Sequence, residues 1–102
     1  MAELEVVWSH FAKSQRDEIF KYWKHRNKSN YFSKKLRLKI KSKTEQLKIQ
    51  PFSGKEIVES SCRILIFGNY SLVYKFTETQ IQIVSFWDNR QNPEKLQQIL
   101  GL

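Results

Sequence analysis

The segment of residues 62–93 restricts the fold of this chain more than any other part of the sequence. It reads CRILIFGNYSLVYKFTETQIQIVSFWDNRQNP and holds three short runs rich in β-branched and aromatic residues, which are typical of strands. Gly68-Asn69 lies between the first two runs and carries the residues that a tight turn prefers. The short polar segment 77–79 separates the second run from the third. This pattern predicts an antiparallel meander, and Arg90 follows its last strand.

The first half of the sequence predicts one strand and two helices. Residues 3–8 include two valines and a tryptophan, which favour a first strand, and Ser9 then suits the N-cap of a helix over residues 10–25. Residues 31–49 combine helical spacing of apolar side chains with an alternating, strand-like stretch, LRLKIKSK. Because these 19 residues contain no Gly or Pro and exceed the usual length of a strand, we expect a helix.

Length and element order then predict the fold class. With 102 residues, the chain is long enough for a single domain, residues 1–102, with a modest two-layer core. We expect an α+β fold: an N-terminal strand and an antiparallel two-helix hairpin packed on a mostly antiparallel, twisted four-stranded sheet, a turn at residues 52–55, and a short C-terminal helix over residues 94–100. Cys62, the single cysteine, forbids an internal disulfide and is expected to be a half-buried strand residue.

Positive charge is concentrated in the first half of the chain. The net charge is +8; residues 1–55 hold 14 Lys or Arg against five acids, whereas residues 56–102 hold four against five. Helix surfaces usually intersperse both signs, so this excess indicates a polyanionic or acidic partner rather than a merely solvated face. No apolar run is long enough to span a membrane, and the N-terminus is acidic where a secretory signal would be basic. We therefore expect a cytoplasmic protein.

Several short motifs, taken in order, resemble the RelE/ParE-type toxins of bacterial type II toxin–antitoxin systems. They are VVWSHFA before the first helix, DEIFKYW within it, Pro51 and Gly54 after the second helix, CRILIFGNYSLVYKF, and IQIVSFWDNRQNP. The most specific part runs from Arg63 to Tyr74 and is followed by the strand that ends in Arg90. The resemblance implies a small cytosolic toxin that a cognate antitoxin silences by laying an acidic segment over its surface.

The RelE branch of this family cleaves messenger RNA on the ribosome, which requires cations against the phosphate and groups that exchange protons. The resemblance implies Arg63 and Arg90 as catalytic residues, with Lys55 and Asp88 as weaker candidates. A guanidinium does not transfer protons at neutral pH, Leu65 stands where a basic residue is expected, and both histidines lie in the first helix. As a nuclease site, this set is incomplete.

The ParE branch acts on DNA gyrase without a known hydrolytic site, and the sequence favours this reading. Such a toxin needs only a shaped, charged surface. We expect Trp87 and Arg90 to bind the target, because Trp and Arg often dominate interface energy, and we expect one of Phe86 and Trp87 to be exposed. The basic residues of the second helix should form an electrostatic landing zone: Lys34, Lys35, Arg37, Lys39, Lys41 and Lys43.

These readings define the expected partners. The favoured function is a ParE-like toxin that arrests growth by binding gyrase, with an acidic antitoxin docked in the groove between the helical hairpin and the sheet as a hetero-oligomer. The alternatives are a RelE-like mRNA interferase acting on the ribosome and messenger RNA, and a non-toxic basic module that binds nucleic acid. The first strand could also pair with another chain at the sheet edge. We expect no cofactor and no metal ion.

Overall fold

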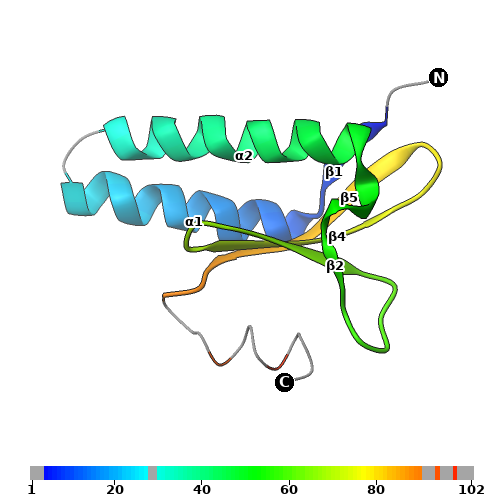
Figure 1. The fold of residues 1–102 in the computed structure, drawn as a ribbon. Coiled ribbons are helices and arrows are strands. Elements are labelled where there is room, and N and C mark those ends of the chain that lie inside the picture. Colours follow the sequence, from blue (N-terminus) through cyan, green and yellow to red (C-terminus); the bar gives the residue numbers. More distant parts are fainter. Residues whose placement is uncertain (1–3, 28–29, 91–93, 95–97, 99–102) are drawn as a thin grey trace.

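The computed structural model describes residues 4–27 and 30–90, together with Glu94 and Gln98 (Figure 1). The elements in chain order are β1 (Glu5–Trp8), α1 (His10–Asn27), α2 (Tyr31–Ile49), the 3-10 helix η1 (Pro51–Ser53), β2 (Lys55–Glu56), β3 (Arg63–Phe67), β4 (Tyr70–Phe76) and β5 (Gln80–Asp88). The predicted first strand, two helices and meander are confirmed. The predicted helix over residues 94–100 lies outside the described residues apart from Glu94 and Gln98.

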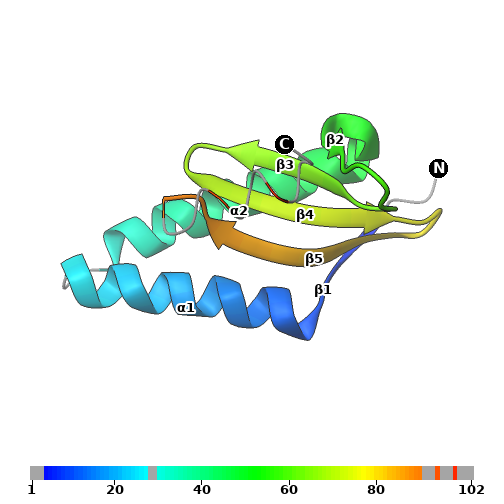
Figure 2. The ribbon, with the colours of Figure 1, turned by 90° about the horizontal axis from the view of Figure 1, so that it is seen from below.

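The sheet has five strands in the order β1-β5-β4-β3-β2. β1 runs parallel to β5, with Glu5 opposite Gln80, and the other neighbours are antiparallel; Figure 2 shows β3, β4 and β5 side by side. The prediction of four strands is wrong because β2, which begins at the last residue of the predicted turn, pairs with β3. A strand of two residues is too short to show alternation in the sequence, so only its pairing with β3 reveals it.

The two helices form an antiparallel hairpin over one face of the sheet (Figure 1). Ser9 caps α1 as predicted: its Oγ accepts the N–H of Ala12 at 3.0 Å and donates to the carbonyl oxygen of Val84 in β5 at 3.2 Å. The cap therefore also attaches the start of α1 to the sheet. Within the described part of the chain, no helix is both long enough and apolar enough to cross a membrane.

The strand-like stretch in the second helix is helical because of the side chains that it buries. Leu36, Ile40 and Leu47 are buried, and their spacing places them on one helix face. In a strand, Leu38 would share a face with Leu36 and Ile40, yet it is 68 % exposed. The alternation therefore reflects lysines on both flanks of a helix, and the prediction of a helix over residues 31–49 is confirmed.

Both faces of the sheet carry buried apolar side chains. The main core lies between the sheet and the helices and includes Phe86. A second buried cluster consists of Ile64, Val73 and Trp87. The expectation that one of Phe86 and Trp87 is exposed is wrong, since their exposed fractions are 0 % and 7 %. Successive residues of β5 point to opposite faces, and each of these two packs into the cluster on its own face.

Candidate functional site

Arg90 lies just beyond β5, where Asp88 holds its side chain in one orientation. Nε and Nη2 of Arg90 donate to the two carboxylate oxygens of Asp88 at 3.0 and 2.7 Å, and the backbone N–H of Arg90 donates to Oδ1 at 2.9 Å. The Asp88 side chain is 3 % exposed, whereas that of Arg90 is 44 % exposed. A bidentate pair of this kind fixes the plane of the guanidinium. Among the described residues, none hydrogen-bonds its Nη1.

Aromatic rings from α1 and β4 support this guanidinium. Its central carbon lies 5.0 Å from the ring centre of Trp23 and 5.8 Å from that of Tyr70, and Nη2 donates to the Tyr70 hydroxyl at 3.4 Å. The hydrogen bond to Asp88 raises the pKa of Arg90 above its ordinary value. Burial, followed by the charge of Asp88, raises the pKa of Tyr70. At neutral pH, Arg90 is therefore a cation and Tyr70 is a neutral hydroxyl.

A cavity of about 220 Å³ opens beside Arg90, between α2 and the β3–β4 turn. We call it the Arg90 cavity, and its lining residues are Phe32, Lys35, Leu36, Lys39, Gly68, Asn69, Tyr70 and Arg90. Lys35 and Lys39 are four residues apart and so share one side of α2. Gly68, in the turn, has a φ of +59°, and a Cβ there would lie 3.5 Å from the Lys39 Nζ. Among these lining residues, three are cations and none is an acid.

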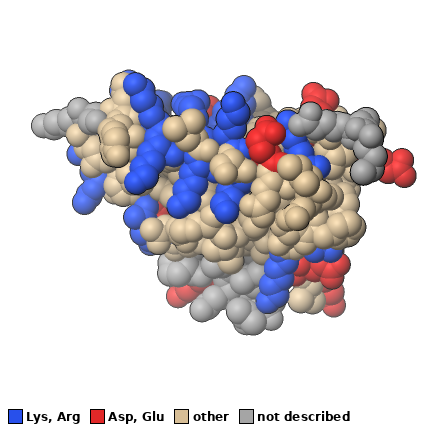
Figure 3. Space-filling view, turned by 45° about the horizontal axis from the view of Figure 1, so that its top comes forward, with Lys and Arg blue, Asp and Glu red and all other residues tan. Residues whose placement is uncertain are grey.

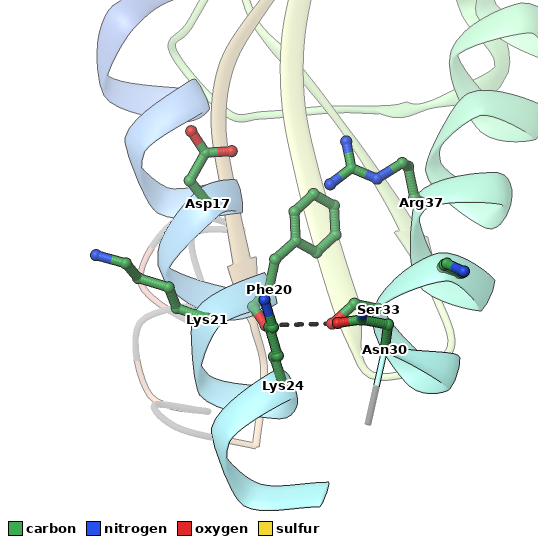
Figure 4. A pocket seen from close by; sticks show the side chains of 8 residues that line it. Asp17, Phe20, Lys21, Lys24, Asn30, Ser33 and Arg37 are labelled. Atoms are coloured by element: carbon green, nitrogen blue, oxygen red, sulfur yellow. Dashed lines mark hydrogen bonds between the residues drawn. The ribbon is translucent and has the colours of Figure 1, made fainter. Parts of the chain in front are cut away.

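A second hollow, of about 410 Å³, lies between the two helices (Figure 4). We call it the interhelical groove, and its lining residues are Asp17, Phe20, Lys21, Lys24, Asn30, Ser33, Lys34 and Arg37. The Ser33 hydroxyl donates to the carbonyl oxygen of Phe20 at 3.2 Å and joins the helices across it. Arg37 extends from α2 over the Phe20 ring, with 4.5 Å from its guanidinium carbon to the ring centre. A smaller hollow of about 190 Å³ shares Phe20 and Arg37 and continues toward Arg16 and Lys41.

The predicted landing zone is divided between these two hollows. Lys and Arg side chains gather over the helices in Figure 3. Lys34, Arg37 and Lys41 face α1, whereas Lys35 and Lys39 face the β3–β4 turn. Within the predicted set, only Lys43 is half-buried, and the rest are exposed. The single basic surface expected from the sequence is therefore two surfaces on opposite flanks of α2.

Arg63 has a structural environment that differs from that of Arg90. Its Nη1 donates to the carbonyl oxygen of Gly54 at 2.7 Å, and its Nη2 pairs with the Glu56 carboxylate at 3.0 Å. The guanidinium carbon also lies 5.0 Å from the ring centre of Phe52. With its side chain 17 % exposed, Arg63 holds the segment after α2 against the start of β3.

The structure does not bring Arg63 and Arg90 together. On β4, Tyr74 is the partner of Arg63 and Tyr70 is the partner of Asp88. Four residues of strand, about 14 Å, separate these two positions. The two arginines therefore cannot clamp one phosphate, as a shared catalytic role would require.

The other predicted residues are dispersed. Lys55 is exposed on β2, at the Arg63 end of the sheet. Asp88 is buried beneath Arg90, and Trp87 is buried in the cluster on the other face of the sheet. His10 and His25 are exposed on α1. The described part of the chain contains no group of three His, Cys, Asp or Glu that could hold a metal ion.

Sequence patterns do not single out Trp23 and Tyr70 as site residues, although both contact Arg90. Tyr70 pairs with Asp88 across β4 and β5, which places the two on one face of the sheet. This pairing follows from the sequence only if two things are known: the length of the β4–β5 turn, and the register shift by which Val73 pairs with Ser85 but Tyr74 with Ile83. Trp23 reaches Arg90 only through the docking of α1, for which the sequence has no local signal.

Comparison with known proteins identifies a family and a similar fold. The family model described as "ParE toxin of type II toxin-antitoxin system, parDE" matches residues 6–93. Among solved structures, a chain of the "Chromosomal ParDE TA system from P. aeruginosa" aligns with a TM-score of 0.71 and 16 % sequence identity. The alignment covers 84 % of this chain and 96 % of that one, and at this identity it shows the fold alone. No curated protein is similar enough in sequence to count as a relative.

Proposed function

Because the chain belongs to the ParE toxin family of type II toxin–antitoxin systems, we propose that it arrests bacterial growth by binding DNA gyrase. The matched segment, residues 6–93, includes every described helix and strand except the first residue of β1. The toxin acts in the cytoplasm, and a cognate acidic antitoxin neutralises it.

The main observation behind this proposal is that the Arg90 guanidinium is held in one orientation. Its orientation is set by Asp88 and by two aromatic rings, so a partner need not order a flexible side chain on binding. Arginine is also among the residues that most often dominate interface energy. Lys35 and Lys39 surround it in the same cavity and would steer an acidic partner toward it. The target contact is therefore centred on the Arg90 cavity.

The chemistry of this site supports binding rather than RNA cleavage. Cleavage needs a group that accepts a proton near neutral pH. The pKa of Arg90 and the pKa of Tyr70 are both raised, so neither side chain accepts one there. Arg63 is held by Gly54 and Glu56 at the other end of the meander and cannot assist.

The antitoxin would neutralise the toxin by covering the same cavity. The Arg90 cavity lies between α2 and the β3–β4 turn, where an acidic segment is expected to dock against the helical hairpin and the sheet. Its apolar residues, Phe32 and Leu36, sit beside three cations. An antitoxin segment that alternates acidic and apolar side chains matches this lining.

The proposal is tested by measuring whether a variant that lacks the charges of Arg90 and Asp88 still arrests growth. Arg90→Ala alone would leave the buried Asp88 carboxylate without its main partner and destabilise the fold. We therefore combine Asp88→Asn with Arg90→Gln, which keeps a side-chain hydrogen bond and removes both charges. In cells without antitoxin, the double variant should lose growth arrest, whereas Lys55→Ala should retain it. Full toxicity of a folded double variant would exclude the Arg90 cavity as the target contact.

Two assays with purified protein identify the target. The protein should inhibit supercoiling by DNA gyrase and should leave messenger RNA intact on programmed ribosomes. Cuts that repeat at codon spacing on the ribosome, without an effect on gyrase, would establish the RelE-like alternative instead.

A further inference from the structure

The interhelical groove plays no part in the function proposed above, and its charge suggests a ligand of its own. We propose that this groove, with its continuation toward Arg16 and Lys41, binds the phosphate backbone of duplex DNA. This activity goes beyond gyrase binding and does not depend on it, since the groove and the Arg90 cavity lie on opposite flanks of α2.

Positive charge predominates around the groove. Six basic side chains line the groove and its continuation: Arg16, Lys21, Lys24, Lys34, Arg37 and Lys41. The lining contains one acid, Asp17, whose Oδ1 accepts from Nε and Nη2 of Arg16 at 3.4 Å each. Because like charges so close together repel one another, such a cluster is expected where a polyanion binds.

The basic side chains are also spread along the length of both helices. On α1, Arg16 and Lys24 are eight residues apart, about 12 Å along the helix axis. On α2, Lys34 and Lys41 are seven residues apart and cover a similar length. Because the two helices are antiparallel, the two rows form a track rather than a point; Figure 4 shows Lys24 on α1 and Arg37 on α2. Duplex DNA carries one charge per about 1.7 Å of axis, so about seven phosphates fall within that length.

The floor of the groove argues against an amphipathic protein helix as the occupant. A helix binds in a groove by burying a row of apolar side chains. Here, Phe20 is 8 % exposed, and the guanidinium of Arg37 lies 4.5 Å from its ring centre. The other groove residues that α2 contributes are polar or charged. The Phe20 ring is therefore covered by a cation, and the α2 side chains beside it end in polar or charged groups.

The lining also favours a duplex over a single strand. Proteins that bind single strands stack bases on exposed aromatic side chains. Phe20, the aromatic residue of the groove, is covered by Arg37, and Trp8 in the continuation is covered by the guanidinium of Arg16 at 4.6 Å. Contacts to a continuous backbone need no stacking and carry no sequence preference.

Salt-dependent binding of a labelled DNA duplex tests the proposal. Affinity for a duplex of about 20 base pairs is measured by fluorescence anisotropy between about 50 and 200 mM salt. The wild-type protein should bind, and log K should fall linearly with log salt concentration. Lys24→Ala combined with Lys34→Ala should reduce that slope by about 2 and weaken binding by about 10-fold or more at low salt. Both lysines are exposed, so circular dichroism should show an unchanged fold.

A matched double variant distinguishes a binding site in the groove from a general effect of the protein's positive charge. Lys55→Ala combined with Lys75→Ala removes the same charge from exposed positions on the sheet and should leave the slope almost unchanged. Equal losses in the two double variants would overturn the proposal, as would equally tight binding of a single strand. Poly-glutamate that binds with the same dependence on Lys24 and Lys34, where the duplex does not bind, would assign the groove to an acidic protein segment.

Replacing the acid in the groove gives a second test, in which DNA binding should become stronger. Asp17→Asn removes the negative charge from the lining and should strengthen duplex binding severalfold. Glu78→Gln, at an exposed position in the β4–β5 turn, changes the net charge by the same amount and should have less effect. An equal gain in both variants would show that only the net charge matters.

Discussion

Arg63 and Arg90 differ in what their guanidinium groups bind, and this difference separates a structural role from a functional one. Arg63 donates to the carbonyl oxygens of Phe52 and Gly54 and pairs with Glu56, so its donors serve the chain itself. Arg90 is held along one edge by Asp88, and its other edge faces a cavity. A partner can use the second arrangement without breaking an internal bond.

Replacing Arg63 should therefore affect stability. We expect Arg63→Ala to lower the free energy of unfolding by about 1.5–3 kcal/mol, because the charge-assisted hydrogen bond to the partly buried carbonyl oxygen of Gly54 is lost together with those to Phe52 and Glu56. Equilibrium unfolding in urea measures the change, and Lys75→Ala, an exposed control on β4, should stay within about 0.5 kcal/mol of wild type. If Arg63→Ala left stability unchanged and abolished toxicity, the structural role assigned to Arg63 would be wrong.

The elements of the fold depend on a few side chains at their ends. Ser9 is the clearest case, because its hydroxyl both caps α1 and bonds to β5. Tyr74 performs a similar task for the segment after α2: its hydroxyl donates to the carbonyl oxygen of Pro51 at 2.6 Å and accepts the N–H of Gly54 at 2.8 Å. These two contacts attach the start of α1 and the segment after α2 to neighbouring strands of the sheet.

Loss of the α1 cap should be measurable. Ser9→Ala is expected to lower the free energy of unfolding by about 1 kcal/mol or somewhat more, since the N–H of Ala12 and the carbonyl of Val84 both lose a partner. Ser14→Ala, an exposed position within α1, provides the control and should be neutral or slightly stabilising. Thermal unfolding followed by circular dichroism compares the two, and equal effects would argue against a capping role.

Over the molecule as a whole, charged and buried apolar side chains occupy different surfaces. The two flanks of α2 carry cations, and both faces of the sheet carry apolar clusters. Among the buried polar groups are two tyrosine hydroxyls whose pKa values burial raises, those of Tyr70 and Tyr74. The free energy of unfolding therefore depends on the ionisation of these two hydroxyls at alkaline pH.

Stability should fall as the solution becomes alkaline. The unfolded chain releases its tyrosine protons near pH 10, while the folded chain keeps those of Tyr70 and Tyr74 to higher pH. The native state then binds more protons than the unfolded state, so the free energy of unfolding decreases as pH rises above about 10. Tyr74→Phe should flatten this dependence in urea unfolding series, and Tyr22→Phe, on the surface of α1, should not. Identical slopes in the two variants would contradict the assignment.

Patterns in the sequence predicted the first strand, the two helices, the three-strand meander, the α+β class and the family. The signals behind these predictions were strand alternation, helical spacing, the Ser9 cap and the Gly68-Asn69 turn. Each of them depends only on residues that are close together in the sequence. The tertiary structure alone decided the fifth strand, the burial of Trp87, the separation of Arg63 from Arg90 and the division of the lysines between two hollows. Each of these depends on strand register or helix docking, which place residues distant in the chain side by side, and no local pattern records such contacts.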